Sequence, residues 1–318
     1  MKIVVLDGYA LNPGDLSWNQ LKNMGDCQIY DRTKPEEIFG RIGDAELVIT
    51  NKVVLDKSLI DKLPDLRYIG VTATGYNVVD VKAATDRNIT VTNIPAYSTD
   101  SVAQLVFSHI LNMANRVELH ANSVREGAWT RNTDFSYWKT PQTELAGKTI
   151  GIVGFGRIGR KVAEIALAFG MKVIFQNRSI KADIPEGFIQ KSLEEVFTES
   201  DFVSLNCPFT NENNAFVNQS LIKTMKSTAV LINTGRGGLI NEQDLAKALN
   251  SGQIAAACLD VLSTEPPLPD NPLISAKNCF ITPHVAWATL EARERLMNVV
   301  LDNLRLFILG RPQNVVKA

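Results

Sequence analysis

One segment constrains the fold more than any other, because it joins a strand, a glycine-rich turn and a helix. The apolar run Thr149–Val153 leads into Gly154, Gly156 and Gly159, and helical spacing of apolar residues continues over Arg157–Phe169. The first glycine permits the tight turn, the second admits a pyrophosphate close to the backbone, and the third lets helix and strand pack closely. The pattern predicts a dinucleotide site at the helix N-terminus, rather than an ordinary turn. The predicted contacts are Gly154, Gly156, Arg157, Ile158 and Gly159.

Short apolar runs alternate with helical stretches along the whole chain. The runs are continuous rather than alternately polar and apolar, which is typical of strands buried on both faces of a parallel sheet. A second clear helix follows Asn241, a suitable N-cap, and stops at Gly252. Strands alternating with helices predict an α/β protein with doubly wound sheets. The predicted strands are Lys2–Leu6, Glu46–Thr50, Leu66–Val71, Thr149–Val153, Lys172–Gln176, Phe202–Leu205, Ala229–Ile232, Ala256–Val261 and Cys279–Thr282.

Length and composition narrow the class of protein. A chain of 318 residues exceeds what one hydrophobic core supports, so two domains are expected. The formal net charge of -1 leaves no basic excess, which argues against nucleic acid as the main partner. The four cysteines lack paired spacing, so neither a disulfide framework nor a metal site is expected. The first apolar stretch, Ile3–Leu6, is too short for a signal peptide or membrane span, so a cytoplasmic protein is expected.

The end of the strand Lys172–Gln176 bears on which dinucleotide binds. The glycine fingerprint expects an acidic residue about 20 positions further on, where it holds the ribose hydroxyls. Asn177, Arg178 and Ser179 stand there instead, with Lys181 close behind and no carboxylate. Asn177 can still bind a ribose hydroxyl, and Arg178, with Ser179 and Lys181, can bind a 2′-phosphate that a carboxylate would repel. These residues favour NADP over NAD, although an ordinary turn with a solvated arginine is the simpler interpretation.

Three further segments follow predicted strands. They contain Arg236, Glu265 and His284, each shortly after an apolar run. In an open α/β sheet, ligands bind at the carboxyl ends of the strands. The three side chains are therefore expected at one edge of the sheet, beside the glycine turn. His109 and His120, which stand in a helical stretch without a motif, are expected to be structural.

With these motifs the sequence resembles the D-isomer-specific 2-hydroxyacid dehydrogenase family, and within it most closely the glycerate dehydrogenases (hydroxypyruvate reductases). The resemblance covers essentially the whole chain. It implies a Rossmann cofactor domain, residues 99–290, inserted in a flavodoxin-like substrate domain made of residues 1–98 and 291–318. A long helical stretch from about Asp100 to Val124, and the helix after His284, are then the two crossings between the domains.

The resemblance assigns roles to the three strand-end residues. Arg236 should bind the carboxylate and carbonyl oxygen of the substrate, and His284 should be the general acid in reduction and the base in oxidation. Glu265 should hydrogen-bond to His284. The chemistry needs these residue types, because hydride addition to a ketone builds charge on oxygen, and histidine can donate a proton near neutrality. An adjacent carboxylate favours the imidazolium form, and arginine matches a 2-keto carboxylate with two parallel donors.

The resemblance also marks weaker site residues. Ala73, Thr74 and Gly75 match a loop whose backbone amides hold the substrate carboxylate. Cys207, Pro208, Thr234 and Asp260 are expected on the cofactor side, where Asp260 could support the nicotinamide region or simply cap a strand. The aromatic segment 125–143 corresponds to an arm that family dimers exchange, so a homodimer is expected. Trp138 of this arm is expected to reach the partner's active site and to influence which substrate fits.

The expected function is hydride transfer between NADP or NAD and a small 2-keto acid, with hydroxypyruvate or glyoxylate giving D-glycerate or glycolate. One alternative is another member of the superfamily, such as a lactate- or formate-type dehydrogenase. Formate enzymes are expected to have glutamine in place of Glu265, which argues against that class. A second alternative is a dinucleotide-sensing protein similar to a corepressor, which would bind the cofactor without turnover.

Overall fold

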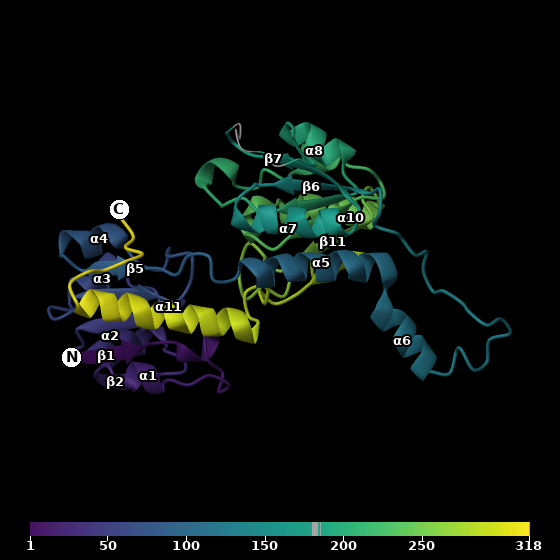
Figure 1. Cartoon of the computed structure of the whole chain (residues 1–318). Coiled ribbons are helices and arrows are strands. Elements are labelled where there is room, and N and C mark those ends of the chain that lie inside the picture. The colour runs from purple at the N-terminus through teal and green to yellow at the C-terminus, as the bar shows by residue number, and fades with distance from the viewer. Residues whose placement is uncertain (180–183, 185, 318) are drawn as a thin grey trace. The chain divides into compact units, whose positions relative to one another are not determined.

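The chain folds into two compact units in a computed structural model that describes residues 1–179, 184 and 186–317. The first unit comprises Met1–Tyr97 with Ala288–Ala318, and the second is the continuous segment Ser98–Trp287 (Figure 1). Each unit is built on one parallel sheet. The predicted α/β class with two doubly wound sheets is therefore confirmed. Within the described ranges, no helix is both long and apolar enough to cross a membrane.

The first unit has a five-stranded sheet in the order β2-β1-β3-β4-β5, with every neighbouring pair parallel. This is the flavodoxin-like order. β3 and β4 are buried along their whole length, as their continuous apolar sequences predict. The strands are β1 (Lys2–Val5), β2 (Asp26–Ile29), β3 (Leu47–Thr50), β4 (Tyr68–Val71) and β5 (Thr90–Thr92).

Helices cover both faces of this first sheet. Residues of α2, α3 and α4 join one hydrophobic cluster with the strands, including Ile42, Ile60 and Ala84, all fully buried. The C-terminal helix packs against β4 through Phe307, whose ring lies 4.8 Å from the ring of Tyr68. The helices are α1 (Asn19–Lys22), α2 (Ile38–Ile42), α3 (Lys57–Ile60), α4 (Val81–Asp86) and α11 (Leu290–Ile308).

The second unit has a seven-stranded sheet in the order β12-β11-β10-β9-β6-β7-β8, again parallel throughout. Numbered from β6, the order is the Rossmann arrangement with one strand added at the far edge. The order reverses between β6 and β9, and ligands bind at such a switch point. The strands are β6 (Thr149–Val153), β7 (Lys172–Gln176), β8 (Phe188–Gln190), β9 (Phe202–Leu205), β10 (Val230–Asn233), β11 (Ala256–Leu259) and β12 (Cys279–Ile281).

Two hydrophobic clusters lie on the two faces of this second sheet. One cluster contains side chains of α5 and α7, and the other contains side chains of α8, α9 and α10. The predicted N-cap Asn241 is confirmed, since its side chain accepts from the Asp244 amide, and Gly252 ends the same helix in the left-handed conformation. The helices are α5 (Thr99–Asn115), α6 (Val117–Arg125), α7 (Arg157–Ala168), α8 (Leu193–Glu199), α9 (Gln219–Ile222) and α10 (Glu242–Ser251).

The prediction of one continuous helix from about Asp100 to Val124 is wrong. Arg116 adopts a left-handed conformation, with φ 47 and ψ 47, and separates α5 from α6. Its guanidinium lies over the ring of Phe280, 4.5 Å from the centroid, a cation–π contact that favours this conformation. Beyond the break, α6 and the segment after it project away from the sheet as an arm (Figure 1).

Candidate active site

The three glycines of the turn after β6 have different surroundings. Gly154 has φ 96, and a methyl group there would lie 2.5 Å from the Cys207 amide nitrogen. A methyl at Gly159 would lie 2.2 Å from the Gly154 carbonyl oxygen. At Gly156, by contrast, nothing lies within 4 Å of the same position. Gly154 and Gly159 therefore allow close packing of the chain, whereas Gly156 leaves open space above the backbone, as a bound pyrophosphate requires.

The surroundings of this turn fit a bound dinucleotide. Gly156 is the N-cap of α7 and makes no side-chain cap, so the first amides of the helix can bind phosphate. Among the described residues, buried Thr234 Oγ1 and Asn206 Oδ1 have no hydrogen-bond partner. A buried polar atom without a partner is costly, and a polar ligand can remove that cost. Thr234 is one of the predicted cofactor contacts. The sequence prediction does not include Asn206, although it is a polar residue directly after the buried strand β9.

The end of β7 has an ordered turn. Asn177 Oδ1 accepts weakly from the Phe155 amide at 3.4 Å, and its Nδ2 donates to the carbonyl and hydroxyl oxygens of Ser179 at 3.2 and 3.3 Å. Arg178 and Ser179 are exposed to solvent. Both can therefore donate to an anion at this strand end. Lys181, predicted to assist them, lies outside the described residues.

His284 and Glu265, which follow two strands of the second unit, are in direct contact. His284 Nδ1 lies 2.6 Å from Glu265 Oε2, and the other carboxylate oxygen of Glu265 accepts from the Leu262 amide at 3.1 Å. The predicted contact between these two residues is present. With Nδ1 engaged, Nε2 is the ring nitrogen that can exchange a proton with a substrate.

Asp260 holds the loop that carries His284. Its carboxylate is 1% exposed and accepts from Thr282 Oγ1 at 2.6 Å, from the Val285 amide at 2.9 Å and from the Ala286 amide at 2.8 Å. The backbone amide of His284 also donates to the Asp260 carbonyl oxygen at 2.9 Å. His284 has φ 54, a left-handed conformation that costs a non-glycine residue about 1–3 kcal/mol. These hydrogen bonds offset that strain, so Asp260 positions the histidine whatever else it contacts.

The turn after β10 presents Arg236 at the surface. Buried Asn233 shapes the turn, since its Oδ1 accepts from the Gly235 amide at 3.0 Å and its Nδ2 donates to the Arg236 carbonyl at 2.9 Å. Gly237 lies against the chain after β11, where a methyl group would lie 1.9 Å from the Leu262 carbonyl carbon. The Arg236 side chain is exposed and is thus available to an anionic ligand.

The loop after β4 in the first unit presents free backbone donors. The Ala73 carbonyl accepts from the Ile94 amide at 3.0 Å, and Thr74 is held by hydrogen bonds to Asn93 and Ile94 at 2.8 Å. Within the described part of the chain, the amides of Ala73, Thr74 and Gly75 donate to no acceptor. Successive amides without an acceptor can bind an anion where they point to one side.

The remaining predicted residues are placed as follows. Cys207 and Pro208 follow β9 beside the glycine turn, and burial raises the pKa of the Cys207 thiol, which keeps it protonated. Trp138 lies on the arm and is 71% exposed, so no described residue of its own chain encloses it.

All four cysteines are free thiols. Among the described residues, no group of three histidine, cysteine, aspartate or glutamate side chains could hold a metal ion.

Fold and site together define a nicotinamide-dependent oxidoreductase of the Rossmann class. The profile "D-isomer specific 2-hydroxyacid dehydrogenase, NAD binding domain" matches residues 107–286. The chain is 48% identical to the hydroxypyruvate reductase of Blautia hydrogenotrophica over 99% of each chain. It is 38% identical to the glycerate dehydrogenase of Methylorubrum extorquens over 100% of this chain and 99% of the relative.

A solved structure agrees with these sequence matches. An acyclic imino acid reductase in complex with NADPH and D-Arg is 34% identical, with a TM-score of 0.86, covering 99% of this chain and 100% of that chain. This protein belongs to the D-isomer-specific 2-hydroxyacid dehydrogenase family. It is an oxidoreductase that acts on a CH–OH group with a nicotinamide cofactor.

Proposed function

We propose that this protein reduces a small 2-keto acid, hydroxypyruvate or glyoxylate, to D-glycerate or glycolate. The observation that carries the proposal is the contact of 2.6 Å between His284 Nδ1 and Glu265 Oε2, after strands of the sheet that also carries the glycine turn. The names of the relatives support the substrate class, because hydroxypyruvate reductase and glycerate dehydrogenase describe one conversion in its two directions.

His284 exchanges the proton of the reaction. Hydride addition to the carbonyl carbon builds negative charge on oxygen, so a proton donor must lie within hydrogen-bond distance of that oxygen. When bound, the reduced nicotinamide supplies the hydride. His284 donates from Nε2 in reduction and accepts there in oxidation, while Glu265 orients the ring through Nδ1. The contact between Nδ1 and Glu265 sets the tautomer of the neutral ring, in which Nδ1 carries the proton and Nε2 can accept one.

Arg236 and the loop after β4 bind the substrate. The guanidinium of Arg236 binds the substrate carboxylate and the carbonyl oxygen, and its permanent charge stabilises the developing alkoxide. The resemblance to the family also assigns the amides of Ala73, Thr74 and Gly75, in the first unit, to the carboxylate. The guanidinium of Arg236 by itself suits a short acid that has its carboxylate next to the ketone.

NADP is the proposed form of the cofactor. Asn177 Nδ2 donates to Ser179 Oγ at 3.3 Å, which leaves the Ser179 hydroxyl hydrogen for an acceptor such as a 2′-phosphate. The exposed Arg178 adds a planar charged donor at the same strand end. The NADPH complex of the similar imino acid reductase supports this choice.

The proposed assembly is a homodimer in which Trp138 influences substrate choice from the partner subunit. Trp129, Phe135 and Trp138 on the arm are 52%, 91% and 71% exposed. Large aromatic side chains gathered on an exposed segment are typical of an interface. A second copy of the chain would cover them.

Initial rates of reduced-cofactor oxidation test the proposal. We expect turnover with hydroxypyruvate or glyoxylate in preference to pyruvate, and faster turnover with NADPH than with NADH. A strong NADH preference would refute the role of Arg178 and keep the enzyme class. Cofactor binding with no turnover of any keto acid would indicate a sensing protein instead. Turnover of an imino acid without turnover of any keto acid would indicate that the substrate is an imino acid, as for the similar imino acid reductase.

A further inference from the structure

Trp138 is an exposed side chain whose neighbours in sequence are both tied to α6. On one side, the Tyr137 hydroxyl and Ser123 Oγ lie 2.9 Å apart and share a hydrogen bond. On the other side, the Lys139 amide donates to His120 Nε2 at 3.0 Å. His120 and Ser123 stand three residues apart on α6, so both belong to one face of the helix. Trp138 is thus flanked by two residues tied to α6, Tyr137 through its side chain and Lys139 through its backbone amide, while its own side chain is exposed.

The contacts of His120 define its tautomer. A backbone amide can only donate, so Nε2, which faces the Lys139 amide, carries no proton. Nδ1 then carries the proton and donates to the Arg116 carbonyl oxygen at 2.9 Å. Arg116 is the left-handed residue between α5 and α6. The imidazole of His120 therefore links the break in the helix to the returning chain of the arm.

A third contact joins Trp129 and Phe135, on the part of the arm that lies between α6 and Tyr137 in the sequence. Trp129 Nε1 donates to the Phe135 carbonyl oxygen at 2.9 Å. The arm thus has ordered backbone and exposed aromatic side chains at the same positions. Ordering an exposed aromatic gains nothing for an isolated subunit, but it lowers the entropy cost of a later contact, and tryptophan is common among residues that dominate binding energy.

We propose that His120 and Ser123 are positioning residues that hold Trp138 in the orientation with which it shapes the substrate site of a second copy of this chain. The role of Trp138 rests on the proposed function above, whereas the two tethers rest on contacts within one subunit. Both tethers are contacts within the arm. Their effect on specificity passes through Trp138.

The tether is tested by fluorine NMR on the full-length protein labelled with 5-fluorotryptophan. The chain has only four tryptophans, so each resonance can be assigned by a Trp→Phe change. We expect His120→Ala to move and narrow the Trp138 resonance, with Trp18 and Trp287 unchanged. His120→Gln is the matched control, because its amide oxygen can accept at about the position of Nε2, and should restore the native signal. An unchanged Trp138 resonance in His120→Ala would overturn the proposal.

Kinetics separate the tether from the role of Trp138. We expect His120→Ala to change the ratio of kcat/KM for hydroxypyruvate over glyoxylate in the same direction as Trp138→Ala, by roughly threefold to tenfold. The double variant should match Trp138→Ala alone, because one residue acts through the other. A changed ratio in Trp138→Ala with none in His120→Ala would overturn the positioning role. No change in Trp138→Ala would overturn the proposed role of Trp138 itself, and the NMR result would still decide the tether.

Discussion

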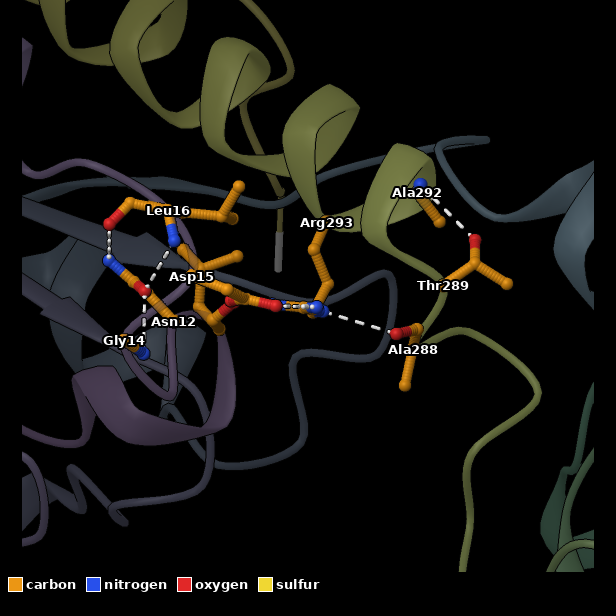
Figure 2. A network of polar contacts seen from close by, with 9 residues as sticks. Asn12, Gly14, Asp15, Leu16, Ala288, Thr289, Ala292 and Arg293 are labelled. Atoms are coloured by element: carbon orange, nitrogen blue, oxygen red, sulfur yellow. Dashed lines mark hydrogen bonds and ion pairs between the residues drawn. The ribbon is translucent and has the colours of Figure 1, made fainter.

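Arg293 on α11 and Asp15 in the loop after β1 form an ion pair with two parallel contacts, Nη1 to Oδ1 and Nη2 to Oδ2, each 2.6 Å long (Figure 2). Nε of the same guanidinium donates to the Ala288 carbonyl at 3.1 Å, and Nε of Arg295 donates to the Tyr97 carbonyl at 2.9 Å. Tyr97 and Ala288 are the residues at which the chain leaves and re-enters the first unit. The start of α11 therefore anchors both crossings.

The Arg293–Asp15 pair predicts an acid-dependent loss of stability. The Arg293 guanidinium holds the pKa of the Asp15 carboxyl below its usual value. A carboxyl with a lower pKa in the folded state stabilises the fold above its unfolded pKa, and this contribution disappears as pH falls through the folded value. Asp15→Asn should thus melt below wild type by a constant margin from pH 7 to pH ~5, and the margin should shrink below pH ~4.

Thermal melts across this pH range check the prediction. Asp65→Asn is a suitable control, because within the described residues Asp65 has no ion pair, and it should melt like wild type. If the difference in melting temperature between Asp15→Asn and wild type did not shrink at acidic pH, the charge of Asp15 would not be what stabilises the unit.

Gly154 and Gly156 should respond oppositely to alanine. Gly154→Ala places a methyl 2.5 Å from the Cys207 amide nitrogen at a φ of 96, so it should lose about 2–4 kcal/mol of unfolding free energy. Gly156→Ala meets nothing within 4 Å and should melt like wild type, yet bind the cofactor roughly tenfold more weakly. Calorimetric melting and cofactor titration measure both. Equal melting temperatures for the two variants would contradict the different roles given to the two glycines, packing for Gly154 and cofactor binding for Gly156.

Asp260→Asn should lower kcat without unfolding the protein. The carboxylate accepts three hydrogen bonds, and the amide has one oxygen, so its nitrogen would face a donor of the loop at residues 282–286. His284 would shift, and a displacement of about 1 Å costs roughly 100-fold in rate. Thr282→Val removes one of these hydrogen bonds and should have a smaller effect. Steady-state kinetics at saturating cofactor, with kcat unchanged in Asp260→Asn, would refute the positioning role.

His284 and Glu265 should behave as a unit. His284→Gln removes the proton donor and should lower kcat by about 10²–10⁴ while leaving cofactor affinity unchanged. Glu265→Gln should have a smaller effect, because the ring of His284 remains. The double variant should be no slower than His284→Gln alone, since Glu265 acts through the histidine. Additive losses in the double variant would show an independent role for Glu265.

Arg178→Ala should change the cofactor preference. Loss of one charge-assisted contact to the 2′-phosphate is expected to reduce kcat/KM for NADPH by roughly 10- to 100-fold. The rate with NADH should stay within about twofold, because NADH has no 2′-phosphate for Arg178 to contact. Equal losses with both cofactors would mean that Arg178 supports the fold or the adenine rather than the phosphate.

Most strands could be predicted from sequence, and the three that were missed share one property. β2, β5 and β8 each lie at the edge of a sheet. β2 and β8 are partly exposed, whereas β3 and β4 are buried at every residue. An edge strand that is only partly covered does not need a continuous apolar run, although β12, also a partly buried edge strand, has one and is therefore predicted.

Local chemistry determined the parts of the site that sequence reasoning found. The glycine turn, the histidine and the arginine each follow a strand directly, and a parallel sheet brings all such positions to one edge whatever the rest of the chain does. Sequence alone therefore indicated the class of enzyme and where its chemistry lies.

How those residues are held depends on contacts between segments that are distant in sequence. The contacts of Asp260 with the loop of His284, of Arg293 with Asp15 and of His120 with Lys139 join segments that are separate in sequence. Arg116 interrupts a stretch of helical sequence, and its guanidinium contacts Phe280 of β12, which is distant in sequence. Such contacts form only once the sheets have brought distant segments together, since no periodicity within either segment encodes the partner.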